Sequence, residues 1–160
     1  MVFPIIFLFA LLGTAQAQND NMPVSLLPKG RAVFTLVRDI QLPTDRNADL
    51  WIQGAQVSSG ERLRRGEPGC TLRHYGRGIK LRSGTAFVMP DNTLRATVSS
   101  FRSIPLERST GMVLDCAATV DYGRFGPYLA GDGGQIGILT IGQLRQALQG
   151  TFRLTIRPRD

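Results

Sequence analysis

The chain has 160 residues and carries 19 Lys and Arg against 12 Asp and Glu, a formal net charge of +7 at pH 7. Its hydrophobic fraction of 42% excludes an intrinsically disordered protein, and its length suits one domain with its own core. The 18 glycines and the low aromatic fraction of 8% favour a β-rich domain with glycine-dependent turns.

Residues 1–17 have the pattern of a secretory signal peptide. An apolar run from Val2 to Leu12 precedes Ala15 and Ala17, whose small side chains at alternate positions suit a signal peptidase. The run is shorter than the roughly 20 residues of a membrane-spanning helix. No Lys or Arg precedes it, so an upstream start is the alternative. We expect a mature chain that starts at Gln18, has no transmembrane segment, and is periplasmic or secreted.

Residues 18–29 are expected to form a flexible leader, and residues 30–160 a single β-rich domain. Strand patterns bounded by Gly, Pro, Asn or Asp cover residues 32–38, 50–57, 70–75, 79–82, 85–89, 94–101 and 112–121. Their number and spacing predict an antiparallel β-sandwich or small barrel.

Two of the predicted strands carry the only two cysteines. Alternation along 112–121 places Cys116 on the apolar face with Leu114, and along 70–75 it places Cys70 on the same face as Leu72. Exported proteins fold in an oxidising compartment, so we expect a disulfide between Cys70 and Cys116 that bridges the core. In the chain-entropy model, closing a loop of this length stabilises the fold by about 4 kcal/mol.

A short helix and a final strand complete the predicted fold. Thr140 and Gln143 have the capping-box pattern at the start of the helix, and Gly150 follows its end. The last strand is expected over residues 151–156. The inward positions of these two elements are Leu144, Ala147, Leu148, Phe152, Leu154 and Ile156.

Residues suited to catalysis are few. His74 is the only histidine, and along an extended strand it lies about 13 Å from Cys70, too far for a Cys–His dyad. One His and two oxidised cysteines make no zinc ligand set, so neither a metal nor a cofactor is expected. Asp115 and Asp121 are the carboxylates that a hydrolase would use, but they lie about 20 Å apart along one strand, and solvated surface positions are the alternative.

The Gly-rich stretch over residues 131–137 resembles a phosphate-binding loop only in composition. Ile136 occupies the sixth position of the dinucleotide fingerprint, where glycine is required. A hairpin or crossover loop is therefore expected there.

Two groups of residues are candidate binding surfaces. The first comprises Arg73, Tyr75, Lys80 and Arg82, within a span that also holds Arg62, Arg64, Arg65 and Arg77. A ring among cations can stack on a sugar or base while guanidinium groups bind an anion. The alternative is a charged solvent face that protects a sheet edge from aggregation.

The second group comprises Tyr122, Arg124, Phe125 and Tyr128, in a glycine-rich connection. Exposed rings on a loop can contact carbohydrate or protein. The alternative is that the rings fold inward and pin a long loop.

These features predict an exported, disulfide-stabilised, non-enzymatic envelope domain that binds an anionic polymer, such as an acidic glycan or lipopolysaccharide, or an envelope protein. A protein-binding inhibitor or envelope assembly factor with an acidic partner is the first alternative. A carboxylate-dependent hydrolase is the second. Nucleic acid satisfies the charge requirement but is not favoured.

Overall fold

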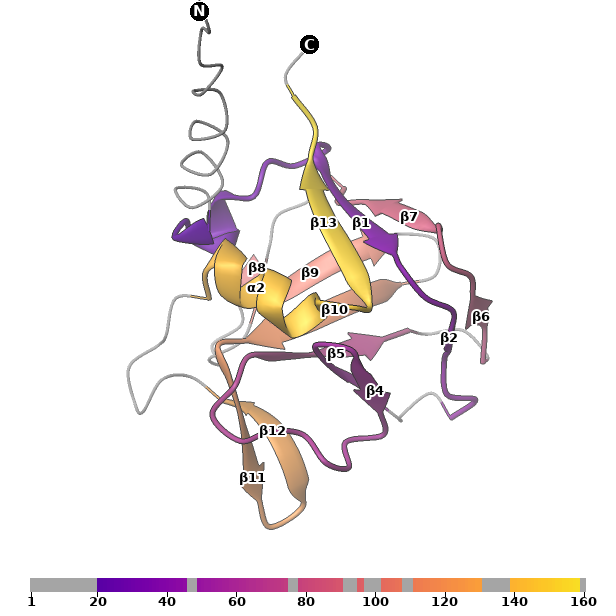
Figure 1. Ribbon diagram of the computed structural model, residues 1–160, viewed down its shortest axis with the longest axis vertical. Coiled ribbons are helices and arrows are strands. Elements are labelled where there is room, and N and C mark those ends of the chain that lie inside the picture. The colour runs from indigo at the N-terminus through magenta and orange to yellow at the C-terminus, as the bar shows by residue number, and fades with distance from the viewer. Residues whose placement is uncertain are drawn as a thin grey trace, which may run out of the picture.

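The computed structural model describes residues 20–45, 49–74, 78–90, 95–96, 102–107, 111–130 and 139–158. Antiparallel β-strands dominate these residues, and the α-helix α2 (Ile141–Leu148) comes directly before the last strand (Figure 1). The predicted signal peptide and the glycine-rich stretch 131–137 lie outside the described residues.

The larger sheet has six antiparallel strands in the order β4-β3-β5-β10-β9-β8. These strands are β3 (Leu50–Gln53), β4 (Gln56–Ser58), β5 (Gly69–Arg73), β8 (Arg95–Ala96), β9 (Arg102–Glu107) and β10 (Met112–Ala117). Its inner face carries a row of fully buried side chains, because Leu72, Leu114 and Ile104 are register partners across β5, β10 and β9. This row forms the floor of the main core.

A second layer packs on that inner face. It consists of α2 and a three-stranded sheet in the order β13-β1-β7, with β1 (Ala32–Leu36), β7 (Ala86–Val88) and β13 (Phe152–Ile156). Phe34, Leu144 and Leu148 are fully buried from this side, and they belong to the same core as Leu72 and Leu114. Within the described residues no sheet closes into a barrel, so the predicted mainly β fold is confirmed in its sandwich-like form.

Two pairs of strands lie outside these layers. The short pair consists of β2 (Ile40–Gln41) and β6 (Lys80–Leu81), and the longer pair is a hairpin of β11 (Thr119–Gly123) and β12 (Gly126–Ala130). Figure 1 shows the β11–β12 hairpin projecting beyond the larger sheet, at the end of the molecule opposite to the end of β13.

Helix α2 begins as its sequence predicts. The Thr140 hydroxyl accepts a hydrogen bond from the Gln143 backbone N–H at 3.2 Å, and the Gln143 side chain accepts one from the Thr140 N–H at 3.0 Å. Gly150 has a φ of 81° directly after the helix, a conformation that a side chain disfavours. The capping box and the helix end are therefore confirmed.

Two predicted strands are each divided in the structure. The segment 50–57 is a tight hairpin, because Gly54 has a φ of 63° and turns β3 back into β4. The segment 112–121 bends at Ala118 and continues as β11 of the projecting hairpin. The alternation that puts Leu114 and Cys116 on the apolar face continues to Ala118 and Val120, and both are buried, so the pattern holds although the single strand is wrong.

The predicted flexible leader over 18–29 is wrong for the part that the structure describes. Val24 is fully buried, and its N–H donates to the Leu139 carbonyl at 2.9 Å. Asp20 forms an ion pair with Arg145 of α2. Apolar side chains from this segment complete the core beside the helix, so the domain includes residues from Asp20 onward.

The Cys70–Cys116 disulfide is present, but its place differs from the prediction. The two cysteines are direct register partners on β5 and β10, with their Cα atoms 4.1 Å apart. The bond therefore joins neighbouring strands within one sheet instead of bridging two layers. Alternation shows which face a side chain occupies, but it does not show whether two strands are neighbours or face each other.

Replacing both cysteines, as Cys70→Ala with Cys116→Ala, should lower the free energy of unfolding by about 4 kcal/mol, because a 46-residue separation is no longer closed in the unfolded chain. Urea unfolding followed by circular dichroism measures the loss. Treating the wild-type protein with a reductant should reproduce it. Equal unfolding midpoints for the oxidised and reduced proteins would contradict this account.

Candidate functional site

The β11–β12 hairpin presents two residues at its tip. Register pairing runs from Thr119 with Ala130 to Gly123 with Gly126, so Arg124 and Phe125 form the two-residue turn. Gly126 has a φ of 116°, a backbone conformation that only glycine adopts readily. The sequence thus makes a short turn that places a cation and a ring at the end of a projection.

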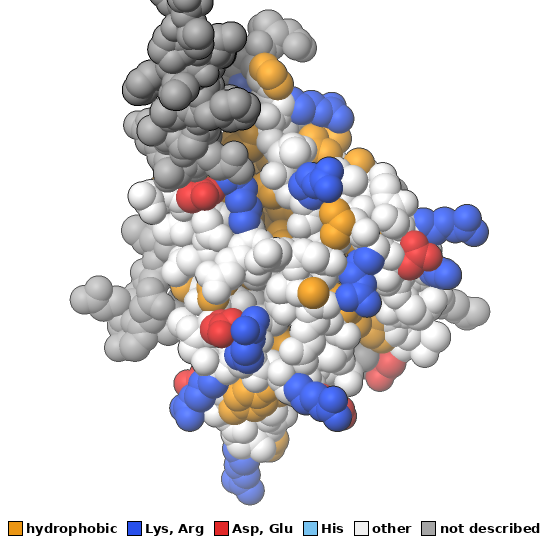
Figure 2. Space-filling model, in the orientation of Figure 1, with side chains coloured by type: hydrophobic (Ala, Val, Ile, Leu, Met, Phe, Trp, Pro, Cys, Tyr) orange, Lys and Arg blue, Asp and Glu red, His pale blue; other side chains and the backbone are white. Residues whose placement is uncertain are grey.

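The Phe125 side chain is 97% exposed. The guanidinium carbon of Arg124 lies 5.7 Å from the centre of its ring, within cation–π range. Tyr122 and Tyr128 are 40% and 48% exposed. Figure 2 shows hydrophobic side chains gathered near this lower end of the molecule, with basic side chains around them. The alternative in which the rings fold inward is therefore wrong for Phe125.

The two faces of the hairpin have different surroundings. Val120 and Leu129 are register partners on one face, and they pack with Trp51 and Leu63 in a second, smaller hydrophobic cluster. Tyr122 lies on that face, and its hydroxyl donates to the Leu63 carbonyl at 2.9 Å. Tyr122 thus partly fixes the hairpin, while the opposite face carries Tyr128.

The hairpin approaches the main chain before β5 very closely. The N–H of Val120 donates to the Glu67 carbonyl at 2.8 Å, and the N–H of Gly66 donates to the Val120 carbonyl at 2.9 Å. A Cβ on Gly69 would lie 2.4 Å from a methyl group of Val120. Glycine at position 69 therefore permits this contact, because a side chain there would push the hairpin away.

Asp121 links the hairpin to the same loop by charge. Its carboxylate lies 2.6 Å from Nε of Arg65, accepts the Tyr122 backbone N–H at 2.7 Å, and accepts the Tyr128 hydroxyl at 3.4 Å. The Tyr122 N–H first, and then the Arg65 guanidinium, hold the pKa of Asp121 below its usual value of 3.8.

The structure joins parts of the two predicted surfaces. The loop over 61–67 carries Arg62, Arg64 and Arg65, and it lies against a hairpin that is more than 50 residues away in the sequence. Arg64 pairs with Glu67 at 3.0 Å. We call Tyr122, Arg124, Phe125 and Tyr128, together with the 61–67 loop, the hairpin surface. Sequence reasoning missed this contact, because only the tertiary fold brings the loop and the hairpin together.

The rest of the predicted basic cluster is partly neutralised. Arg73 pairs with Asp49 at 3.3 Å and with Asp115 at 3.2 Å, and Lys80 pairs with Asp39 at 3.3 Å. The pKa of Asp39 is lowered, first by the N–H of Ser83 and then by Lys80. Arg82 is exposed, and Tyr75 and Arg77 lie outside the described residues.

Asp115 is buried, which corrects the expectation of a solvated carboxylate. Its side chain is 5% exposed, accepts a hydrogen bond from the Ser103 hydroxyl, and pairs with Arg73. Thr71, its register partner on β5, is 2% exposed. The outer face of the larger sheet is therefore shielded from solvent around Asp115. The alternating pattern of the sequence does not show this shielding.

His74 directly follows β5 and is 3% exposed. Its Nε2 donates to the Pro43 carbonyl at 3.2 Å. Across the described ranges, no three His, Cys, Asp or Glu side chains come close enough to hold a metal ion. None of the helices in the described part of the chain is long and apolar enough to cross a membrane.

Comparison of this chain with protein-family models, with curated proteins and with solved structures finds no match. The molecule is defined by its own features as a mainly β domain with one cross-strand disulfide and a projecting hairpin.

The hairpin should loosen in acid. Because the pKa of Asp121 is lowered in the folded state, its stabilising effect is complete above about pH 4 and is lost as the pH falls through the folded-state pKa. Trp51 is the only tryptophan and packs against Val120, so its fluorescence reports the contact. We expect a change in emission as the pH falls below about 4.

The matched control is Asp121→Asn, which keeps the shape of the side chain and removes the charge that pairs with Arg65. Most of the acid-dependent change should disappear in this variant. An identical acid transition in the wild type and in Asp121→Asn would rule out Asp121 as its origin.

Proposed function

We propose that this protein is an exported, non-enzymatic binding domain that recognises an anionic glycan polymer, such as lipopolysaccharide, through the hairpin surface. The observation that carries the proposal is the tip of the hairpin, where Phe125 is 97% exposed beside the Arg124 guanidinium. An isolated, fully exposed Phe at the end of a projection has no role in the core.

The chemistry of the tip favours a sugar polymer with negative groups. Aromatic faces stack on flat apolar surfaces such as sugar rings, and Tyr128 adds a hydroxyl that can hydrogen-bond. Guanidinium groups bind phosphate and carboxylate in a planar, two-point geometry. The net charge of +7 draws such a polymer toward the protein at long range.

Export is the second part of the proposal. It is supported by the apolar run and the small residues at Ala15 and Ala17. The Cys70–Cys116 disulfide is consistent with an oxidising compartment such as the periplasm or the cell exterior.

The carboxylate-dependent hydrolase receives no support from the two acids first considered for it. Asp115 is buried against Arg73, and Asp121 is bound to Arg65. A general acid or nucleophile must be free to contact substrate, and both carboxylates already have arginine partners. The binding domain is therefore the better account of the described residues.

Removing the tip should weaken binding without unfolding the domain. We expect Arg124→Ala with Phe125→Ala to lower affinity for lipopolysaccharide vesicles about ten-fold, or about 1.4 kcal/mol. Co-sedimentation of residues 18–160 across a salt series measures it, and binding should weaken as salt rises.

The control variant is Lys80→Ala with Arg82→Ala, which removes two positive charges far from the hairpin in the sequence. It should cost much less affinity than the tip variant. Equal losses for the two variants would show that net charge, not the hairpin, governs binding. Absence of binding to lipopolysaccharide, peptidoglycan and an acidic polysaccharide at low salt would refute the proposal.

A further inference from the structure

The outer edge of β13 has backbone groups that no described strand pairs with. Among the strands that the structure describes, β13 stands at the end of its sheet and pairs with β1. The Val37 N–H donates to the Thr151 carbonyl, and the Arg157 N–H donates to the Arg31 carbonyl, which fixes the alternation of the ladder. It follows that Phe152, Leu154 and Ile156 direct their backbone N–H and C=O groups away from β1.

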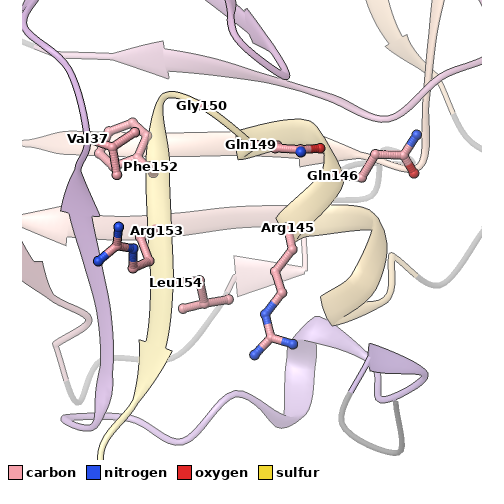
Figure 3. A pocket seen from close by; sticks show the side chains of 8 residues that line it. All are labelled: Val37, Arg145, Gln146, Gln149, Gly150, Phe152, Arg153 and Leu154. Atoms are coloured by element: carbon pink, nitrogen blue, oxygen red, sulfur yellow. The ribbon is translucent and has the colours of Figure 1, made fainter. Parts of the chain in front are cut away.

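A groove of about 630 Å³ lies along this edge, between β13 and α2. Its lining residues are Val37, Arg145, Gln146, Gln149, Gly150, Phe152, Arg153 and Leu154. Figure 3 shows the Arg145 side chain extending from α2 on one side of Leu154, and Arg153 on the β1 side of the strand. A hollow therefore adjoins unpaired strand backbone.

The groove is basic. Arg153 and Arg157 are exposed, and no described acidic side chain forms an ion pair with either of them. Arg145 pairs with Asp20 through one nitrogen, which leaves several of its five N–H donors for another acceptor. An occupant with carboxylates would complement this charge.

We propose that the edge of β13 binds an extended acidic peptide segment as an added strand. Main-chain hydrogen bonds to Leu154 and Ile156 would provide the pairing, since an exposed sheet edge is a template for another strand. Side chains on neighbouring strands share faces, so acidic residues would lie beside Arg153 and apolar residues beside Leu154. The preferred ligand alternates acidic and apolar residues.

A second copy of this chain is a poorer occupant on electrostatic grounds. Two edges that each carry Arg153 and Arg157 would bring like charges together, on a protein whose net charge is +7. Self-association is therefore an outcome of the test and not the expectation.

The test uses residues 18–160 and a fluorescent hexapeptide of alternating Glu and Val. Fluorescence polarisation should show saturable binding that Arg153→Glu weakens at least ten-fold. Arg82→Glu, at an exposed position directly after β6, makes the same change of charge and should leave this binding nearly unchanged. Hydrogen exchange at the Leu154 and Ile156 amides should slow when the peptide is bound.

Two further peptides separate strand addition from simple attraction of charge. Replacing Glu with Lys should abolish binding, and N-methylation of alternate amides should weaken it at least ten-fold, because the added strand loses its donors. Equal binding of the methylated peptide, or equal binding by Arg153→Glu, would overturn the proposal. A peptide-independent dimer that protects the same amides would overturn it as well.

Discussion

The pairing of β5 with β10 is the contact on which the rest of the molecule depends. These strands are adjacent at the centre of the larger sheet, and the Cys70–Cys116 bond joins them at one register position. The segment before β5 and the segment after β10 therefore lie side by side. The 61–67 loop precedes β5 and the hairpin follows β10, so this pairing brings the two parts of the hairpin surface together.

Charge is distributed unevenly over the basic domain. Arg73 and Lys80 pair with carboxylates, which offset part of their positive charge. Arg124 at the hairpin tip and Arg153 beside the β13 groove have no acidic partner among the described residues. Arg124 thus lies where the hairpin projects, and Arg153 lines the groove beside β13.

Local signals in the sequence predicted the local structure well. Alternation identified most strands and the inward cysteines, and the Thr140 capping box located α2. These local signals did not predict which segments contact one another in the folded protein. Gly54 lies within a predicted strand, but its φ of 63° belongs to the turn between β3 and β4. Asp115 was expected to be solvated, because a period-two pattern does not show which side chains cover the outer face of the sheet.

The candidate surface was predicted in composition but not in geometry. Tyr122, Arg124, Phe125 and Tyr128 were recognised as a group, whereas their contact with Leu63 and Arg65 depends on strand pairing across the sheet. Arg73 and Lys80 were predicted to share a binding face, but each pairs with a carboxylate. These partners, Asp49 and Asp39, come from other parts of the chain and could not be identified from the local sequence.

Mapping ligand contacts by NMR would show directly whether the hairpin surface binds an anionic glycan. Amide shifts of residues 18–160 would be followed during titration with a delipidated, phosphorylated lipopolysaccharide oligosaccharide. If the hairpin surface is the binding site, the largest changes fall within 61–67 and 120–130. Changes confined to 78–83 or to the β13 groove, or no changes at all, would contradict it.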